Sequence, residues 1–184
     1  MRLLHAEGVA LVRGGRLLFE GLDFHLDAGE ALHIIGPNGS GKSSLIRLAA
    51  GLLRQSAGHI ERARIALADE HLALDRELPL GRALAFWNGG KPPAAAMQAM
   101  GIDRLADVPV RLLSTGQAKR ARLSRVIAAE AALWLLDEPL NGLDADAAHR
   151  LAQAIAGHRQ AGGAVLAASH QPFGPDWQQL ELGR

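Results

Sequence analysis

Residues 31–50 read ALHIIGPNGSGKSSLIRLAA, and this stretch decides which fold we expect. Its first five residues are mainly apolar, as in a buried strand, and the residues after Lys42 have the Leu, Ile and Ala content of a helix. The loop between them fits the pattern G-x-x-x-x-G-K-[ST], with the strand before it and the helix after it that this pattern requires. The stretch therefore predicts a binding site for a nucleoside triphosphate.

Each residue type in this loop has a chemical reason. Glycines adopt positive φ at little cost, so successive backbone N–H groups can approach phosphate oxygens at the positive end of the following helix. We expect Lys42 to reach the β- and γ-phosphates and the Ser43 hydroxyl to take one place on Mg²⁺. The predicted nucleotide-binding residues of the loop are Gly36, Pro37, Asn38, Gly39, Ser40, Gly41, Lys42, Ser43 and Ser44.

Composition places few further constraints on the function. With 20 basic and 19 acidic residues the net charge is +1, so the whole chain has no bias toward nucleic acid or an anionic membrane. The chain has no cysteine, which excludes disulfides, thiolate metal sites and thiol catalysis. Charged and polar residues interrupt the first fifteen positions, so we expect neither a signal peptide nor a spanning helix there. Any work at a membrane is then expected to go through a partner.

The pattern of the 184 residues predicts a single α/β domain with a small helical insert at about residues 70–130. Close turns near the N-terminus predict an antiparallel meander, and later apolar runs that alternate with helical stretches predict a doubly wound parallel core. The expected strands are 3–5, 9–12, 17–19, 22–26, two within 58–68 with a break at Glu61 and Arg62, 133–136 and 164–168. The expected helices after the first are 80–87, 94–100, a helix capped by Ser114 that runs to about 129, and 144–160.

Two acidic residues follow the apolar run at 133–136. We expect Asp137 to hold Mg²⁺, directly or through a water, and Glu138 to orient or deprotonate the attacking water. His170 comes just after another apolar run, where an imidazole can donate to the γ-phosphate and stabilise developing charge. The predicted catalytic residues are Glu138, His170 and Lys42, and the predicted metal ligands are Ser43 and Asp137.

Residues 113–117 carry a second motif, LSTGQ. It resembles the LSGGQ signature of ATP-binding cassette (ABC) proteins, with Thr115 in place of one glycine. Ser114, Gly116 and Gln117 stand at the start of a predicted helix, which makes this a second surface for phosphate. One chain then carries a phosphate loop and, separately, a helix N-terminus that can bind phosphate. This suggests that two chains meet head to tail around the nucleotide.

The resemblance to ABC proteins extends over nearly the whole chain. The phosphate loop, the signature, the acidic pair, a stretch like the D-loop at residues 141–144 and a switch histidine at 170 occur in the family order. The resemblance implies a P-loop NTPase fold of the ABC type, with an antiparallel β subdomain, a RecA-like parallel-sheet core and a small α-helical insert. It also implies that the chain binds ATP and Mg²⁺ and hydrolyses ATP to ADP and phosphate.

Within ABC proteins the sequence is most similar to the CcmA family, the ATPases of the haem exporter of cytochrome c biogenesis. The stretch AALWLLDEPLNGLD at 131–144 and the triplet at 170–172, His-Gln-Pro, carry this likeness. The likeness implies a homodimer in the ATP-bound state, a membrane-embedded permease, and haem export or release of a haem-loaded chaperone. It places the chain peripherally at the cytoplasmic face of the bacterial inner membrane. The eight histidines are scattered, so we expect no direct haem binding.

Besides Thr115, two positions depart from the ABC pattern. The Q-loop glutamine is absent, and Glu70 or His71 occupies its region. The aromatic residue that stacks on adenine is also absent; Arg13 falls at about that place, and a guanidinium can stack on a base.

Other readings remain open from the sequence. An ABC ATPase of another importer or exporter fits the same motifs, and so does a regulatory cassette that turns ATP over poorly. A non-transport ABC ATPase of the repair or translation type would carry a long coiled coil or a second cassette, and this chain has neither. The basic residues Lys119, Arg120, Arg122 and Arg125 are expected to form a solvated helix face that partly pairs with acidic neighbours, with no nucleic acid as partner.

Overall fold

A computed structural model describes residues 1–71 and 74–183 of the chain. Backbone contacts divide it into two compact units. The first unit consists of Met1–Leu67, Ala131–Pro139 and Gly157–Arg184, and the second consists of Ala68–Glu130 and Leu140–Ala156. The prediction of one domain with an insert at about 70–130 stays a prediction.

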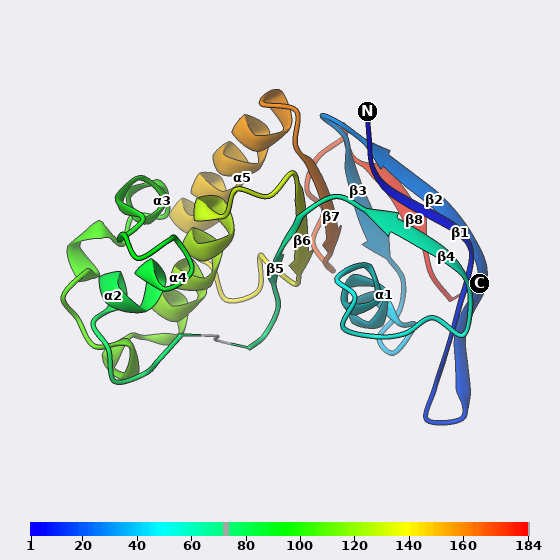
Figure 1. Ribbon diagram of the computed structural model, residues 1–184, viewed down its shortest axis with the longest axis horizontal. Helices are drawn as coiled ribbons and strands as arrows, with labels where there is room; N and C mark the ends of the chain where they lie inside the picture. Colours follow the sequence, from blue (N-terminus) through cyan, green and yellow to red (C-terminus); the bar gives the residue numbers. More distant parts are fainter. Residues whose placement is uncertain (72–73, 184) are drawn as a thin grey trace. The chain divides into compact units, whose positions relative to one another are not determined.

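The first unit contains an antiparallel sheet of three strands in the order β2-β1-β4 (Figure 1). These strands are β1 (Arg2–Arg13), β2 (Arg16–Asp27) and β4 (Ala57–Arg62). The antiparallel arrangement is confirmed, but the four short strands expected in residues 3–26 are two long ones. The reason is that Gly8 and Gly21, both at positive φ, accompany irregular pairing without ending the strands. The turn between the strands lies at Gly14 and Gly15, both at positive φ.

A five-stranded sheet in the order β5-β6-β7-β3-β8 forms the rest of the first unit's framework. Its strands are β3 (Ala31–Ile35), β5 (Ile65–Ala68), β6 (Leu133–Asp137), β7 (Ala164–Ala168) and β8 (Gln178–Glu181). Strand β3 pairs in parallel with both β7 and β8, and β6 pairs in parallel with β7. The predicted parallel core is confirmed. The break between strands that was predicted at Glu61 and Arg62 lies instead between Arg62 and Ile65, because both residues belong to β4. Strand β8 was not predicted.

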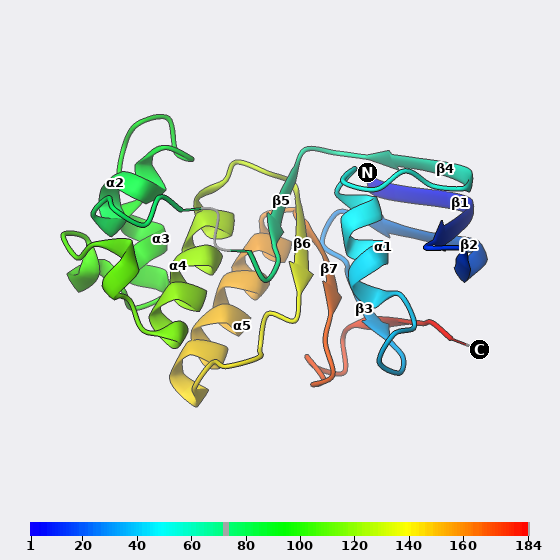
Figure 2. The same ribbon diagram turned by 90° about the horizontal axis from the view of Figure 1, so that it is seen from below.

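Helix α1 (Lys42–Ala49) begins directly after the loop that follows β3 (Figure 2). It buries Leu45, Ile46 and Leu48 against apolar residues of both sheets, and it contacts β6 and β7. These side chains hold α1 in a single core with the two sheets. The loop before α1 is therefore attached at both ends to rigid elements.

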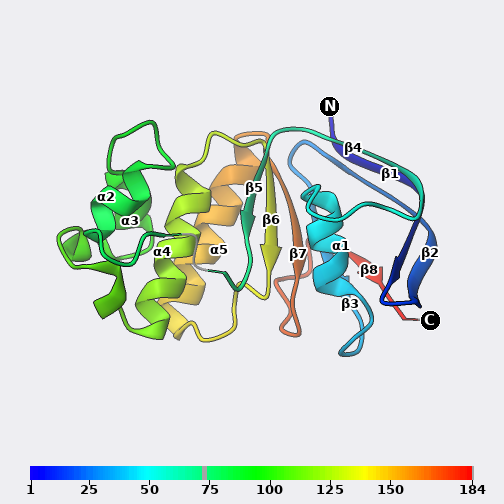
Figure 3. The ribbon, with the colours of Figure 1, turned by 60° about the horizontal axis from the view of Figure 1, so that its bottom comes forward.

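The second unit consists largely of helices (Figure 3). They are α2 (Leu80–Ala85), α3 (Ala94–Ala99), α4 (Thr115–Ala128) and α5 (Ala145–Gln160), together with short 3₁₀ turns at Asp103–Leu105 and Val110–Leu112. Helix α4 packs against α2 and α3, and the last turn of α5 passes into the first unit. The helices expected here are confirmed, although α2 and α3 end one or two residues earlier than predicted.

The last turn of α5 is held to β6 by two stacked rings. The centroids of His158 and Trp134 lie 4.0 Å apart, with an angle of 8° between the rings. A Cβ at Gly163 would lie only 2.2 Å from the His158 ring, so a glycine is needed there. Burial lowers the pKa of His158 below its ordinary value, and backbone groups of Ala164 and Ala132 oppose this shift.

We expect the stability of the fold to fall in mild acid because of His158. A group whose pKa is lower in the folded chain binds its proton more readily in the unfolded chain. The stability that neutral His158 contributes is therefore fully present at a pH above the ordinary pKa of histidine. It is lost as the pH falls from that ordinary pKa toward the lower pKa of His158 in the folded chain. The melting temperature followed by circular dichroism should fall from about pH 7.5 to about pH 5.5, and less so in His158→Phe. Equal falls in the parent, in His158→Phe and in the exposed-site control His59→Gln would contradict this assignment.

Candidate active site

Three predicted functional segments follow three neighbouring parallel strands of the first unit. The phosphate loop follows β3, and His170 comes shortly after β7 (Figure 1). Asp137 is the last residue of β6, and Glu138 follows it. Because parallel strands end at the same edge of a sheet, their loops meet there. The fold therefore brings these segments together, although they span more than a hundred residues of sequence.

The phosphate loop has the backbone that its glycines predict. Gly36, Gly39 and Gly41 have φ of 144°, 79° and 102°. A Cβ at Gly36 would lie 2.4 Å from the carbonyl oxygen of Leu182, so no other residue fits there without a shift of the backbone. Gly41 caps α1 without a side-chain hydrogen bond, and the first turn of α1 carries no acidic residue. Backbone N–H groups and the positive helix end are thus left for an anion.

Lys42 lies over the loop that precedes it. Its Nζ donates to the carbonyl oxygens of Gly36 and Pro37, at 2.8 and 3.1 Å, and the residue is only 7% exposed. The buried Ser40 Oγ has no hydrogen-bond partner among the described residues. A buried ammonium and an unsatisfied hydroxyl on one loop fit a phosphate group, which would accept from both.

The two predicted magnesium ligands are in contact. The Ser43 hydroxyl donates to Asp137 Oδ1 at 2.9 Å, and Asp137 is 3% exposed at the end of β6. A hydroxyl and a carboxylate at this spacing are the oxygen ligands that Mg²⁺ prefers when it also keeps several waters. These residues therefore fit the ion.

Glu138 and His170 also lie together. His170 Nε2 is 3.5 Å from Glu138 Oε1, with half of the His170 side chain exposed and only 16% of the Glu138 side chain exposed. Glu138 has φ of 47°, which costs a non-glycine residue about 1–3 kcal/mol. Its N–H donates to the carbonyl oxygen of Ala168 on β7 at 2.8 Å, and this bond helps to hold the backbone there. The sequence did not reveal this conformation.

Arg13 lies at the first turn of α1. Its Nη1 donates to Ser44 Oγ at 3.4 Å from the end of β1. The guanidinium is exposed beside the phosphate loop, where it can approach the base or the phosphates of a nucleotide.

The signature residues belong to the second unit. Ser114 caps α4: its Oγ accepts from the N–H of Gln117 at 3.2 Å, and Gln117 Oε1 accepts from the N–H of Ser114 at 2.9 Å. The atom nearest to a Cβ built at Gly116 is the carbonyl oxygen of Gly142, at 3.8 Å, so the surface at Gly116 is open. The start of α4 is therefore rigid and accessible.

Arg120 joins the signature helix to the D-loop stretch. Its Nη2 donates to both carboxylate oxygens of Asp144 at 2.7 Å, and its Nη1 lies 3.4 Å from Asp146. Asp144 also accepts from the N–H of Ala147 at the start of α5. That backbone hydrogen bond, followed by the bond from Arg120, lowers the pKa of Asp144 below its ordinary value.

The basic face of α4 pairs in part with acidic neighbours, as expected and as Arg120 shows, but it is not the solvated face that was predicted. Lys119, Arg120, Arg122 and Arg125 are all partly buried. Arg122 donates to the carbonyl oxygen of Asp69 at 2.7 Å, and the Arg125 guanidinium lies 4.7 Å from the centre of the Trp87 ring. Burial lowers the pKa of both Arg122 and Arg125, with opposition from nearby Asp69. The side chains are used in packing because the insert folds over this face, a contact that residue spacing alone does not reveal.

The two residues at the Q-loop position are both exposed. The N–H of His71 donates to Asp69 Oδ1 at 3.0 Å, and its ring Nδ1 lies 3.3 Å from Asp69 Oδ2. Glu70 acts electrostatically on Arg122. His71 is thus held by its own loop.

Residues that the motifs did not indicate also shape the site. The Phe19 ring on β2 lies 3.2 Å from a Cβ built at Gly41, so β2 supports the phosphate loop. Leu182 closes on Gly36 from just after β8. His33 belongs to none of the motifs. It is nevertheless visible in the sequence as the one polar residue of the apolar stretch 31–35.

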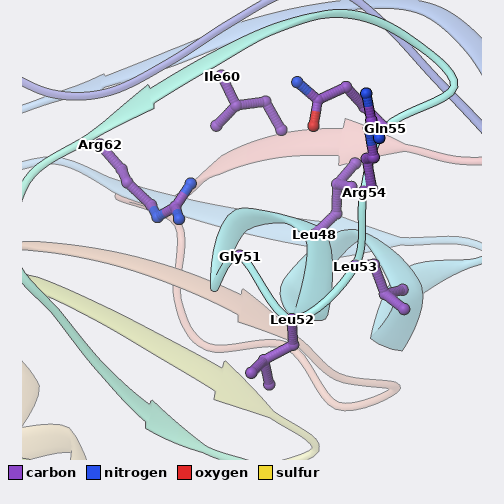
Figure 4. Close-up of a pocket in the computed structure, with 8 residues that line it drawn as sticks. All are labelled: Leu48, Gly51, Leu52, Leu53, Arg54, Gln55, Ile60 and Arg62. Carbon is purple, nitrogen blue, oxygen red and sulfur yellow. The ribbon is translucent and has the colours of Figure 1, made fainter.

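A hollow of about 460 Å³ lies at the C-terminal end of α1, the end opposite to the phosphate loop (Figure 4). Its walls include Arg62, whose guanidinium lies against Gly51, as well as Leu48 and Ile60. A Cβ at Gly51 would lie 2.2 Å from Arg62, and φ there is 76°, as is common for a glycine that follows the end of a helix. The hollow is separate from the nucleotide site.

Comparisons with known proteins agree with this geometry. Residues 19–141 match the family described as ABC transporter. A "Cytochrome c biogenesis ATP-binding export protein CcmA" of Sphingopyxis alaskensis is 56% identical over 98% of this chain and 97% of its own length. A protein of the same name from Zymomonas mobilis is 56% identical over 97% of this chain and 84% of its own. The chain belongs to the ABC transporter family, and within it to the CcmA group.

A solved structure supports the fold. One described as the "Structure of ATP binding subunit of ABC transporter" has a TM-score of 0.87 with 22% identity, and covers 98% of this chain and 85% of that one. The expected fold, an ABC-type P-loop NTPase with an antiparallel and a parallel sheet, is confirmed. As a CcmA-type ABC protein, the chain is the ATP-binding, ATP-hydrolysing subunit of a transporter that includes a membrane permease. None of the helices in the described residues is long and apolar enough to cross a membrane.

We expect Lys42→Ala to weaken ATP binding at least about tenfold, which corresponds to about 1.4 kcal/mol. The variant removes the buried ammonium that lies on the phosphate loop. Affinity can be measured by the fluorescence of a labelled ATP analogue in the presence of magnesium. The exposed Lys91→Ala serves as a control that removes the same charge elsewhere. Unchanged affinity in Lys42→Ala would remove Lys42 from the site.

Proposed function

We propose that this chain hydrolyses ATP in a homodimer bound to a membrane-embedded permease, and that hydrolysis serves haem export or the release of a haem-loaded chaperone in cytochrome c biogenesis. The observation that carries the export role is the 56% identity, over nearly the full length, to proteins named as cytochrome c biogenesis export proteins. Those relatives are bacterial, so the proposed place is the cytoplasmic face of the bacterial inner membrane. The permease, not this chain, is proposed to handle haem.

The hydrolytic role rests on the residues that meet at the strand ends. Glu138 is proposed to accept a proton from the attacking water, and its partly buried side chain on a fixed backbone suits a general base. His170, beside it, donates to the γ-phosphate, and Lys42 neutralises phosphate charge. Ser43 and Asp137 hold Mg²⁺, which when bound neutralises charge on the phosphates.

The dimer proposal rests on the separation of the phosphate-binding groups between the two compact units. Ser114, Gly116 and Gln117 form a rigid, accessible helix start in the second unit, while the phosphate loop is in the first. A helix N-terminus of this kind attracts a γ-phosphate. We propose that the phosphate is supplied by the opposing copy of the chain, and that Arg13 lies against the base.

We expect Glu138→Gln to bind ATP and to accumulate as a dimer. The amide keeps the shape of the side chain but cannot accept the proton from water, so turnover should fall by at least about 10²-fold. Gel filtration with magnesium and ATP should show twice the monomer mass, and mass should return to that of the monomer with ADP. Glu181→Gln is a control at the acidic residue that ends β8, the other neighbour of β3. Normal turnover in Glu138→Gln would contradict its role.

The export role can be tested separately in cells of the source bacterium. We expect the chain to co-purify with a membrane permease, and a strain that carries only the Lys42→Ala chain to lose covalent haem from its c-type cytochromes. Haem staining after denaturing electrophoresis measures this loss. If c-type cytochromes matured normally while ATP hydrolysis was lost, the cytochrome c role would fail and the ATPase assignment would stand.

A further inference from the structure

His33 lies in the middle of β3, two positions before the last residue of the strand. It is only 4% exposed, and its neighbours across the sheet are Ala167 on β7 and Gln179 on β8. A polar ring in such a place lowers stability unless it is hydrogen-bonded. The choice of His over an apolar residue therefore calls for a specific contact.

That contact is with the backbone just before the switch histidine. His33 Nε2 lies 2.8 Å from the carbonyl oxygen of Ser169. A carbonyl oxygen can only accept, so Nε2 carries the proton and donates it. Ser169 is itself 2% exposed, and its Oγ accepts from the N–H of Gln171 at 3.0 Å. The peptide that leads into His170 is thus held from the side of β3.

The same ring also supports the far end of the loop that carries His170. The Phe173 ring lies edge-on to His33, with centroids 5.0 Å apart, and Trp177 is edge-on at 6.4 Å. Phe173 and Trp177 are stacked on each other at 4.2 Å, and β8 begins at the next residue. One side chain therefore touches both the start and the end of the segment 169–177.

We propose that His33 is a positioning residue for His170: its hydrogen bond to Ser169 and its contacts with Phe173 and Trp177 fix the loop that aims His170 at the reacting phosphate. The proposal rests on the role of His170 proposed above. Half of the His170 side chain is exposed, so the direction of its ring depends on how firmly its backbone is held. A misplacement of about 1 Å in a catalytic group can cost about 10²-fold in rate.

Two substitutions separate the hydrogen bond from the ring. His33→Phe keeps the aromatic contacts and removes the donor, whereas His33→Gln places an amide N–H where Nε2 was and removes the ring. We expect kcat for ATP to fall about tenfold in His33→Phe, with KM within about twofold, because binding residues of the phosphate loop are untouched. His33→Gln should recover most of kcat. His33→Leu gives a second donor-free variant if the larger ring disturbs the sheet.

A role in stability alone predicts a different result, so each rate is divided by the folded fraction found from thermal unfolding. If His33 acts through His170, the double variant His33→Phe, His170→Ala should have the same kcat as His170→Ala alone. If the two residues act independently, the two reductions in kcat should multiply. All rates are measured on the full chain purified with its permease.

The outcomes distinguish the two proposals. Loss of activity in His170→Ala with a normal kcat in His33→Phe would overturn the positioning role and leave the hydrolytic site intact. Multiplying effects in the double variant would also overturn it. Full activity in His170→Ala would instead overturn the role of His170, and the role of His33 with it.

Discussion

Parallel pairing of β3, β7 and β6 is the constraint on which the first unit depends. It fixes the strand order, so the phosphate loop after β3, His170 after β7 and Asp137 at the end of β6 lie at the same edge of the sheet. The hydrogen bond from Ser43 to Asp137, at 2.9 Å, is the direct consequence, since it joins the first turn of α1 to the end of β6. A parallel sheet buried on both faces needs apolar strands, and β6 and β7 are buried along their whole length. The proposed catalytic residues are therefore positioned by the same strands that form the core.

Much of this arrangement follows from local patterns in the sequence. The phosphate loop, α1, β6, β7, α4 and α5 were predictable because glycine spacing, apolar runs and helix caps act within a few residues. The contact between Ser43 and Asp137 was predictable in a weaker sense, because two motifs that bind one metal must meet. The individual roles of the site residues remain proposals, since they depend on a nucleotide and a second chain.

What the sequence did not reveal depends on distant contacts. Strand β8 contains two adjacent glutamines, and only its pairing with β3 makes it a strand. The positive φ of Glu138 goes with its N–H bond to Ala168, which lies thirty residues later. The basic face of α4 looks solvated from spacing alone, yet Arg125 lies over Trp87 and Arg122 binds the backbone of Asp69. In each case a partner far away in the sequence decides the outcome, and no local propensity encodes it.

The link between Arg120 and Asp144 joins the signature helix to the stretch of chain that follows the proposed catalytic residue Glu138. Asp144 is six positions after Glu138, and the boundary between the compact units falls between them, after Pro139. Arg120 donates to both carboxylate oxygens of Asp144, and Asp144 accepts from the N–H of Ala147 at the start of α5. These hydrogen bonds connect α4 to the start of α5. Within the second unit, hydrogen bonds thus link the helix capped by Ser114 to Asp144, and residues 139–143 join Asp144 covalently to Glu138. The backbone of Glu138 is in turn held at β7 through its N–H bond to the carbonyl oxygen of Ala168, so the residue proposed as the general base has a fixed backbone within the first unit.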